Sequence, residues 1–489
     1  MALSAFSLIP LSKPTSIPLL SFRRPIPIHA AARELREGLA TEKLDSDNPA
    51  GMHRAITLKS LEERQPERVR IAENGFRMAL GDLLKQSRVL PLCIFGDLAV
   101  EITGIENDSR KVSPGDLFVC CTGYKTDGHL FINDAITRGA VVVIASRNIE
   151  LDGILGCGAL VIVEEVNSFL PHLAANFYGN PSERTTVIGV TGTNGKTTTA
   201  HLVRGIYVAM GVKTGMLGTV GYHAHEEIQL EVPNTTPDAV TVQKLMAKMV
   251  RNGTEAVVME ASSHGLALGR CDAIDFDVAV FTNLTRDHYD FHVTEEDYRN
   301  SKAKLFSGMV DPNCHCKVVN IDDPNAYFFA AQGNENVPVV TYAMENGDAD
   351  VFPLNVELSL RKTAVSVKTP KGNLQISTCL IGRHNVYNIL AAVAVGIGIS
   401  AMLEEIKEGI ERVEAVSGRF ELINENQPFG VIVDFAHTPD ALSRLLDAVR
   451  ELGALRIITG MLHFFPSFMQ IIVLHSFPSL INWTYTIFY

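Results

Sequence analysis

The sequence predicts an α/β protein built on a mostly parallel sheet. A short apolar run, VIGV (187–190), precedes a glycine-bearing turn and a helical stretch. The β-rich runs AVVME (256–260) and VAVFTN (278–283) then alternate with helical spacing over 237–252 and 294–308. Such alternation is typical of parallel strands joined by crossover helices. Ligands of these sheets bind at the carboxyl ends of the strands, so functional residues are expected there.

Length and composition restrict the function classes. At roughly 150 residues per domain, the 489 residues suggest about three domains. The net charge of −12 disfavours direct binding to nucleic acid. The eight cysteines show no CxxC spacing and are expected to be reduced thiols. The tight cluster Cys314-His315-Cys316 has no second ligand pair nearby, so zinc is not expected there.

The N-terminal segment differs in composition from the rest. Residues 1–33 contain five serines, five prolines and no carboxylate, which is typical of an organelle transit peptide. A secretory signal is disfavoured because prolines interrupt the apolar residues between Leu8 and Leu20. Residues 34–77 are charge-mixed and are expected to form a linker that includes the cleavage site.

The C-terminal segment also differs. Residues 461–489 contain no Asp, Glu, Lys or Arg and hold 18 apolar residues in 29. We interpret this tail as an aberrant continuation after Gly460, so that the third domain is incomplete. A membrane anchor is disfavoured because Pro466 and Pro478 interrupt the stretch and no basic flank follows it.

Between these ends the sequence suggests three units. Residues 78–180 form a smaller α/β unit, because LFVCC (117–121) and AVVVIAS (140–146) flank a helical stretch. Residues 181–415 hold the central alternation of strands and helices. Residues 416–460 begin a Rossmann-like unit, and about 45 residues are too few to bury an independent core.

One motif carries specific chemistry. VTGTNGKTTT (190–199) follows a strand and precedes a helix, which is the place of a phosphate-binding loop. Gly192 and Gly195 let backbone amides face phosphate oxygens, Lys196 supplies a cation and Thr197 offers a hydroxyl to magnesium. The loop departs from GxxxxGK[ST], since only two residues separate its glycines. A plain glycine turn is the alternative.

The GTNGKT form of this loop resembles that of the Mur ligases and of the related folylpolyglutamate synthetases, which use ATP to join a carboxylate to an amine. Further segments resemble, in order, the MurE members, which are UDP-N-acetylmuramoyl-tripeptide synthetases. They are DSRKVSPGDLFVCCTGYKTDGH (108–129), NTTP (234–237), MEASSHGLALGR (259–270), FTNLTRDHYDFH (281–292), YRNSKAKLF (298–306), GRHNVYN (382–388), SGRFE (417–421) and VDFAHTPDAL (433–442).

The resemblance covers about residues 78–460 and implies the three-domain Mur ligase architecture, with the phosphate-binding loop in the central ATP-binding domain. The folylpolyglutamate synthetases are disfavoured, because residues 78–180 resemble a UDP-binding domain that they lack.

The resemblance also implies ATP and Mg2+ as cofactors and assigns residues to them. The ATP-binding residues would be Gly192, Thr193, Asn194, Gly195, Lys196, Thr197, Thr198, Asn283, Asn388, Arg419 and Asp434, with His437 nearby. The metal ligands would be Thr197, Glu260 and Lys302, the last as a carbamylated lysine. The catalytic set would be Lys196, Glu260, His288 and Lys302, with His292 close to it.

The residues themselves support part of this assignment. Glu260 ends a predicted strand, where its carboxylate can reach a metal ion held by phosphates; a surface acid is the alternative. Thr294 and Asp297 have capping-box spacing and predict the start of the helix that carries Lys302. Without the resemblance, Lys302 would be interpreted as a solvated lysine.

For the nucleotide-sugar substrate, the resemblance implies uridine diphosphate contacts at Ser109 and near Gly128–His129. It implies muramoyl-dipeptide contacts at Asn234, Thr235, Thr236, Ser262 and Arg270. Arg270 has a physical rationale, because a guanidinium can hold a carboxylate or phosphate in a two-pronged contact; a surface charge is the alternative.

The implied reaction adds an amino acid to UDP-N-acetylmuramoyl-dipeptide through an acyl phosphate. MurE members continue after the segment matching IITG (457–460) with a glycine-rich stretch and a DNPR-like motif for the diamino acid, and neither occurs here. Orienting two reactants can supply roughly 7–11 kcal/mol. The chain as printed is therefore expected to bind nucleotide at best, and the identity of the added amino acid stays open.

A second function is compatible with the resemblance. Plant MurE-like proteins are associated with the plastid transcription machinery and chloroplast development, and the N-terminal segment favours a plastid location. The alternative is therefore a non-catalytic stromal protein that contacts proteins of the transcription complex. Neither direct nucleic-acid binding nor membrane binding is expected.

Overall fold

The computed structural model describes most of the chain between residues 75 and 475. The described ranges are 75–123, 126–146, 156–224, 227–229, 234–288, 290–359, 361–423, 427, 429–436, 439–454, 456–464 and 467–475. The predicted transit peptide, nearly all of the predicted linker and the end of the tail lie outside them. Within these ranges, no helix has the length and apolar character needed to cross a membrane.

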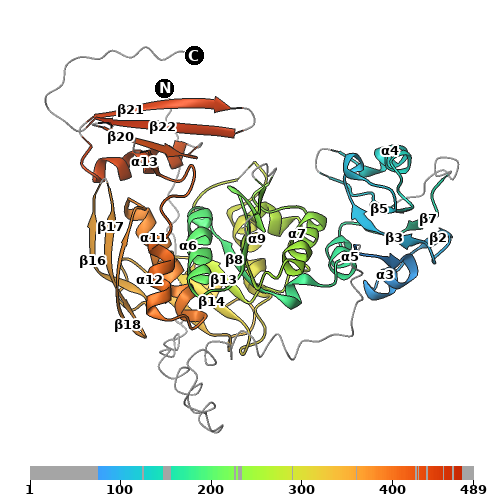
Figure 1. The fold of residues 1–489 in the computed structure, drawn as a ribbon, viewed down its shortest axis with the longest axis horizontal. Coiled ribbons are helices and arrows are strands. Elements are labelled where there is room, and N and C mark those ends of the chain that lie inside the picture. The colour runs from blue at the N-terminus through green and yellow to red at the C-terminus, as the bar shows by residue number, and fades with distance from the viewer. Residues whose placement is uncertain are drawn as a thin grey trace, which may run out of the picture. The chain divides into compact units, whose positions relative to one another are not determined.

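An eight-stranded sheet forms the centre of the fold and confirms the predicted α/β class (Figure 1). Its order is β11-β10-β9-β12-β8-β13-β14-β15; the pairs from β9 to β15 are parallel, and β10 and β11 extend one edge in antiparallel pairing. The strands are β8 (Thr186–Thr191), β9 (Thr214–Gly218), β10 (Gly221–Ala224), β11 (Glu227–Gln229), β12 (Ala256–Glu260), β13 (Val278–Phe281), β14 (Cys316–Asn320) and β15 (Val339–Tyr342).

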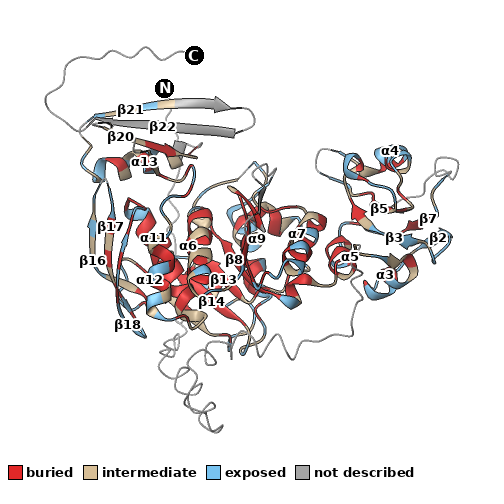
Figure 2. Cartoon of the chain, in the orientation of Figure 1, coloured by how far each residue is buried: buried red, intermediate tan, exposed pale blue. Residues whose placement is uncertain are grey.

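Apolar side chains cover both faces of this sheet. On β8, Ile188 and Val190 pack in one core with α6, α11 and α12, whereas Val187 packs in the other with α7 to α10. Burial on both faces explains the continuous apolar runs in the sequence, and Figure 2 shows β8 and β13 as buried. The helices are α6 (Lys196–Ala209), α7 (Ala239–Arg251), α8 (Ser263–Ala267), α9 (Glu295–Ser307), α10 (Ala326–Ala330), α11 (Arg383–Gly398) and α12 (Leu403–Glu411).

The N-terminal described segment contains a second α/β sheet, of order β2-β7-β6-β5-β4. Its strands are parallel except for β2, which pairs antiparallel with β7 at the edge. The strands are β2 (Cys93–Gly96), β4 (Gly104–Glu106), β5 (Asp116–Val119), β6 (Val142–Ala145) and β7 (Ala159–Ile162), beside a short pair, β1 (Met78–Ala79) and β3 (Glu101–Ile102). The helices are α3 (Leu80–Gln86), α4 (Ile132–Thr137) and α5 (Leu170–Phe177), with 3-10 helices η1 (Ser109–Lys111), η2 (Gly128–Phe131) and η4 (Pro181–Arg184).

A three-stranded antiparallel sheet follows β15 and was not predicted. It consists of β16 (Phe352–Leu358), β17 (Thr363–Thr369) and β18 (Gly372–Thr378). Val365 and Val367 are buried in the core shared with α11, whereas Ser366 between them is only partly buried. This period-2 pattern belongs to a half-buried sheet, which differs from the continuous apolar runs of the parallel strands.

The last described segment differs from the prediction. The strand β20 (Gly430–Asp434), helix α13 (Pro439–Glu451) and strand β21 (Arg456–Phe464) occur where a Rossmann-like unit was predicted to begin. However, β22 (Ser467–His475), from the tail, lies between β20 and β21 and pairs antiparallel with both. With β19 (Glu421–Ile423) the strands form a fully antiparallel sheet. The Ile-, Val- and Leu-containing tail supplies the β-prone residues for this insertion.

Candidate ATP and acyl-transfer site

The predicted phosphate loop joins β8 to α6 at the carboxyl end of the strand. Gly192 has a backbone φ of +148° and Gly195 one of +87°, conformations that residues with a side chain rarely adopt. A Cβ atom at Gly192 would clash with Thr282 Oγ1, and one at Gly195 would clash with Asn388 Oδ1. Both positions therefore require glycine, which makes a generic surface turn a poor description of this loop.

Neighbouring strand ends hold the loop in place. Asn283, just after β13, accepts a hydrogen bond from the Asn194 amide at 2.9 Å and donates to the Asn194 carbonyl at 3.1 Å. The amide of Thr193 donates to the Asn283 carbonyl at 2.8 Å, and its hydroxyl lies 3.0 Å from the Tyr298 hydroxyl. The structure thus brings predicted residues Thr193, Asn194 and Asn283 together, because β8 and β13 are parallel neighbours.

The Lys196 ammonium lies within the loop. Its Nζ donates hydrogen bonds to the carbonyl oxygens of Gly192 at 2.9 Å and Thr193 at 2.8 Å. Burial lowers the pKa of Lys196, and the nearby charge of Glu260 partly opposes that change. Its position at the first residue of α6 suits contact with phosphate oxygens.

Lys302 is buried at this loop, so the solvated lysine suggested by sequence alone is wrong. Its side chain is 1% exposed, and its Nζ donates to the Gly192 carbonyl at 2.8 Å. Burial holds the pKa of Lys302 well below its usual value, and the charge of Lys196 lowers it further. The predicted capping box of Thr294 and Asp297 opens α9 and sets the position of Lys302 on the helix.

Glu260 ends β12 and faces the first turn of α6. It is 1% exposed, and its Oε2 accepts a hydrogen bond from Thr197 Oγ1 at 2.9 Å. Its Oε1 accepts from the Thr219 amide at 2.7 Å. The surface-acid alternative for Glu260 is therefore wrong. Thr198 follows Thr197 in α6 and is also buried. The Thr197–Glu260 oxygen pair fits Mg2+, which commonly uses one or two protein oxygens together with substrate phosphates.

Three histidines gather beside Lys302. The ring of His264 lies 4.7 Å from that of His288 and 5.6 Å from that of His292 between centroids, in edge-to-face contact. Burial lowers the pKa of all three, to about 4 for His288. His264 was not singled out from the sequence. Its position four residues after Glu260, in the segment MEASSHGLALGR, was the available signal.

The residues assigned to the muramoyl-dipeptide also converge near Glu260. Thr236 Oγ1 donates to the Glu260 carbonyl at 2.8 Å and accepts from the Ser262 amide at 2.9 Å. Arg270 Nη1 donates to the Thr236 carbonyl at 2.8 Å. Thr235 Oγ1 lies 3.1 Å from the Thr219 hydroxyl. The described contacts of Asn234 include its carbonyl, which accepts from the Tyr222 hydroxyl at 2.9 Å.

The predicted adenine and ribose residues fall into two groups. Asn388 is buried on α11, where its Oδ1 occupies the space that a Cβ atom on Gly195 would need and its amide donates to Asn385 Oδ1 at 2.9 Å. Asp434, at the end of β20, accepts hydrogen bonds of 2.8 Å from two backbone amides, and burial raises its pKa. The positive charge of Arg419 lowers the pKa of both Lys196 and Asp434. His437 lies outside the described residues.

The predicted uridine diphosphate residues lie on the N-terminal sheet. Ser109 is buried at the start of η1, directly after β4. His129 opens η2 with Asp127, whose carboxylate lies 2.6 Å from His129 Nδ1. The amide of Ser146 donates to His129 Nε2 at 3.1 Å. These residues therefore mark the carboxyl-end loops of β4 and β5 and the end of β6.

Family models match three successive parts of the chain. Residues 101–178 match the Mur ligase family catalytic domain, residues 190–396 the Mur ligase middle domain and residues 418–463 the Mur ligase glutamate ligase domain.

The names of curated relatives also indicate the Mur ligase family. An Arabidopsis thaliana protein named UDP-N-acetylmuramoyl-L-alanyl-D-glutamate--2,6-diaminopimelate ligase MurE homolog, chloroplastic, is 60% identical over 82% of the chain and 51% of its own length. The chain thus spans about half the length of this relative. Rice and maize relatives carry the same name, and these names support the predicted plastid location. A Bacillus velezensis diaminopimelate ligase is 43% identical over 74% of the chain and 73% of its own length.

Solved structures agree with the relatives. A structure titled UDP-N-acetylmuramoyl-L-alanyl-D-glutamate--2,6-diaminopimelate ligase aligns with a TM-score of 0.62 and 26% identity, covering 76% of this chain and 74% of that one. MurF from Acinetobacter baumannii shares the fold, with a TM-score of 0.55. The family models, the bacterial relative and the shared fold together show that the chain belongs to the Mur ligase family.

Proposed function

We propose that the chain binds ATP with Mg2+ at the 192–197 loop, and that its protein is an ATP-dependent amide ligase acting on UDP-N-acetylmuramoyl-dipeptide. The observation that carries the proposal is the convergence of Lys196 and Lys302 on the Gly192 carbonyl, beside the Thr197–Glu260 oxygen pair. A lysine ammonium on a glycine-rich loop, next to a hydroxyl and a carboxylate, is what a nucleoside triphosphate and its metal require, and Lys196 supplies that ammonium.

Each residue of the site would have its own role in phosphoryl transfer. Lys196 and the loop amides would hold the β- and γ-phosphates, and Thr197 and Glu260 would hold Mg2+, which supplies neutralisation of phosphate charge when bound. The substrate carboxylate would attack the γ-phosphorus and release ADP, giving an acyl phosphate. An amine would then attack the acyl carbon, release inorganic phosphate and lose a proton to form the amide.

Lys302 would act as a carbamate. Burial holds the pKa of Lys302 well below its usual value, which favours the neutral amine, the form that attacks the carbon of CO2. An N–C bond forms and the nitrogen releases a proton, so a buried base becomes an anion. The charge of Lys196 lies close enough to lower the pKa of Lys302, and the same charge would stabilise the carbamate.

The acyl donor would lie on the side of Glu260 that faces Thr236 and Arg270. The Arg270 guanidinium uses one nitrogen to bond the Thr236 carbonyl, and its other nitrogens can hold a carboxylate. The diaminopimelate named for the bacterial and plant relatives is the natural candidate for the amine, although the chain covers only part of those proteins.

A plastid scaffold is the second candidate. The three plant relatives are named chloroplastic MurE homologs, and the net charge of −12 favours protein partners over nucleic acid. Such a protein would keep the fold and lack turnover. Its proposed partners are proteins of the plastid transcription complex.

Hydroxylamine trapping separates the two candidates. It captures an acyl phosphate as a hydroxamate, so it reports the first half-reaction without a bound amine. We expect the 489-residue chain to bind ATP in an Mg2+-dependent manner, and Lys196→Met to abolish this while the exposed-site control Lys213→Met does not. Hydroxamate that requires UDP-N-acetylmuramoyl-dipeptide would establish the ligase chemistry. ATP binding without hydroxamate would support the scaffold, and absence of ATP binding would contradict the proposal.

A further inference from the structure

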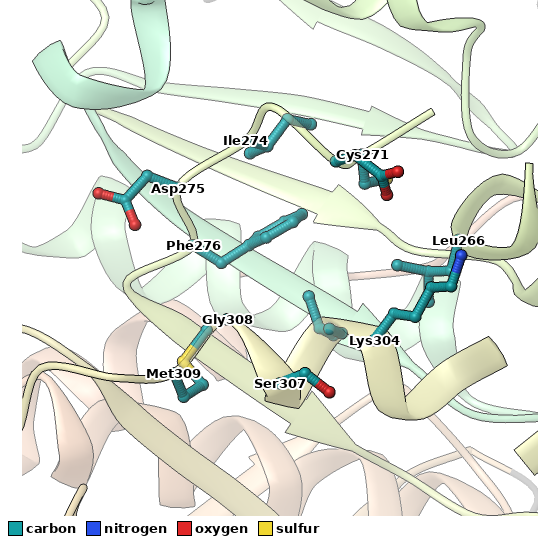
Figure 3. Close-up of a pocket in the computed structure, with 11 residues that line it drawn as sticks. Leu266, Cys271, Ile274, Asp275, Phe276, Lys304, Ser307, Gly308 and Met309 are labelled. Atoms are coloured by element: carbon teal, nitrogen blue, oxygen red, sulfur yellow. The ribbon is translucent and has the colours of Figure 1, made fainter. Parts of the chain in front are cut away.

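A cavity of about 260 Å³ lies between the segment before β13 and the last turn of α9 (Figure 3). Its apolar lining consists of Leu266, Cys271, Ile274, Phe276, Leu305 and Met309. An apolar cavity of ~150 Å³ is large enough to bind benzene. The cavity therefore has room for a ligand larger than a six-membered ring.

The cavity lies away from the nucleotide site. Ile274 and Phe276 precede the amino end of β13, whereas Asn283, which holds the phosphate loop, follows its carboxyl end. Helix α9 runs between these two regions. It places Lys302 at the phosphate loop, and it lines the cavity with residues from Lys304 onward.

Gly308 is an exposed residue in the wall of the cavity. Its backbone lies in the right-handed helical region, with φ −74° and ψ −10°, so the conformation does not require glycine. A Cβ atom built there meets no atom within 4 Å. Since Gly308 lines the cavity, a larger side chain at this position would occupy the space that a ligand needs.

Charged groups of both signs border the apolar lining. Asp272 and Lys304 are exposed cavity residues, and neither forms an ion pair within the described part of the chain. The Lys304 ammonium has a long contact of 3.5 Å to the Ala267 carbonyl. Figure 3 shows the Lys304 side chain extending beside Leu266, at the same end of the cavity as Cys271. The Lys304 ammonium and the Asp272 carboxylate thus lie next to an apolar surface.

We propose that this cavity binds a free amino acid with an aliphatic or aromatic side chain. The side chain would occupy the apolar lining, the α-ammonium would face Asp272 and the α-carboxylate would face Lys304. Each charge of the zwitterion meets the opposite charge, and the net charge of the ligand stays zero, which suits a half-enclosed apolar site. The inference is independent of the proposed ligase chemistry.

The binding test uses the 489-residue chain without nucleotide, titrated with L-leucine and with L-phenylalanine by ligand-observed NMR. We expect saturable binding of at least one of them, weakened at least tenfold by Gly308→Leu. Gly347→Leu is the matched control, because Gly347 is exposed and a Cβ atom there also meets nothing within 4 Å. A far-UV circular dichroism spectrum and a urea unfolding midpoint equal to those of the wild type would show that Gly308→Leu is folded.

Charge variants provide a second test that does not depend on filling the cavity. Asp272→Asn and Lys304→Met should each weaken leucine binding severalfold, and isoamylamine and 4-methylpentanoate, which each lack one charge, should bind more weakly than leucine. Absence of saturable binding, or wild-type binding by Gly308→Leu, would overturn the proposal. Loss of ATP binding with intact leucine binding would instead contradict only the proposed ligase function.

Discussion

Lys196 and Lys302 donate hydrogen bonds to the same atom, the carbonyl oxygen of Gly192, at 2.9 and 2.8 Å. The two lysines are far apart in sequence, one at the start of α6 and the other within α9. Two ammonium groups beside one oxygen repel each other, and burial further disfavours their charged forms. The arrangement therefore lowers the pKa of Lys302 and favours its neutral amine next to the phosphate-binding loop.

The first prediction concerns carbamate formation at Lys302. In 13C NMR with labelled bicarbonate, we expect a carbamate signal from the wild type and its loss in Lys302→Met. Lys304→Met is the control, since this exposed lysine lies two residues away on the same helix. Lys196→Met should weaken the signal, because removing its charge raises the pKa of Lys302 and lowers the neutral fraction. An unchanged signal in Lys302→Met would rule out this lysine as the reacting amine.

The second prediction concerns Gly195. Gly195→Ala places a Cβ atom against Asn388 and forces alanine into a left-handed conformation, so ATP binding should be lost. Gly211→Ala is the matched control, because Gly211 has φ +77° and a Cβ atom there would meet no atom within 4 Å. Both variants should lose about 1 kcal/mol of stability from the left-handed backbone. Equal ATP affinity in the two variants, by equilibrium titration, would contradict the assigned role of Gly195.

A third expectation addresses Glu260. Glu260→Gln keeps the side-chain shape and removes the charge that would face Mg2+, so the Mg2+ concentration needed for ATP binding should rise about tenfold, or ~1.4 kcal/mol. ATP titrations at graded Mg2+ concentrations measure this shift. The exposed Glu255→Gln should behave as wild type. If Glu260→Gln keeps the wild-type Mg2+ dependence, Glu260 is not a metal ligand.

Acid sensitivity gives a fourth prediction. Burial lowers the pKa of His201 and of His223 to about 4, and the charge of Arg204 contributes to both shifts. Between pH 6.5 and 4 the unfolded chain takes up protons that these folded imidazoles do not, so the free energy of unfolding should decrease as pH falls. His223→Gln should reduce this slope by up to ~1.4 kcal/mol per pH unit, the value for one proton.

Urea unfolding at a series of pH values measures that slope. His172→Gln is the comparison, because His172 is exposed on α5 and its replacement should leave the slope unchanged. A His223→Gln slope equal to that of the wild type would mean that His223 is protonated in the folded protein.

Much of the fold could be predicted from local patterns in the sequence. The apolar runs at 187–190 and 256–260 became β8 and β12 because parallel strands are buried on both faces. The antiparallel sheet of β16 to β18 escaped prediction, since its alternating pattern is weaker than a continuous apolar run. The tail strand β22 also escaped prediction, because its position between β20 and β21 depends on pairing with residues distant in sequence.

The sequence by itself determined the phosphate loop, the capping box at Thr294 and the family resemblance, because each depends on residues within a few positions of one another. Only the tertiary structure decided that Lys302 is buried against Gly192 and that His264 joins His288. The reason is physical: exposure and pKa depend on which elements pack around a side chain, and no local spacing specifies that packing.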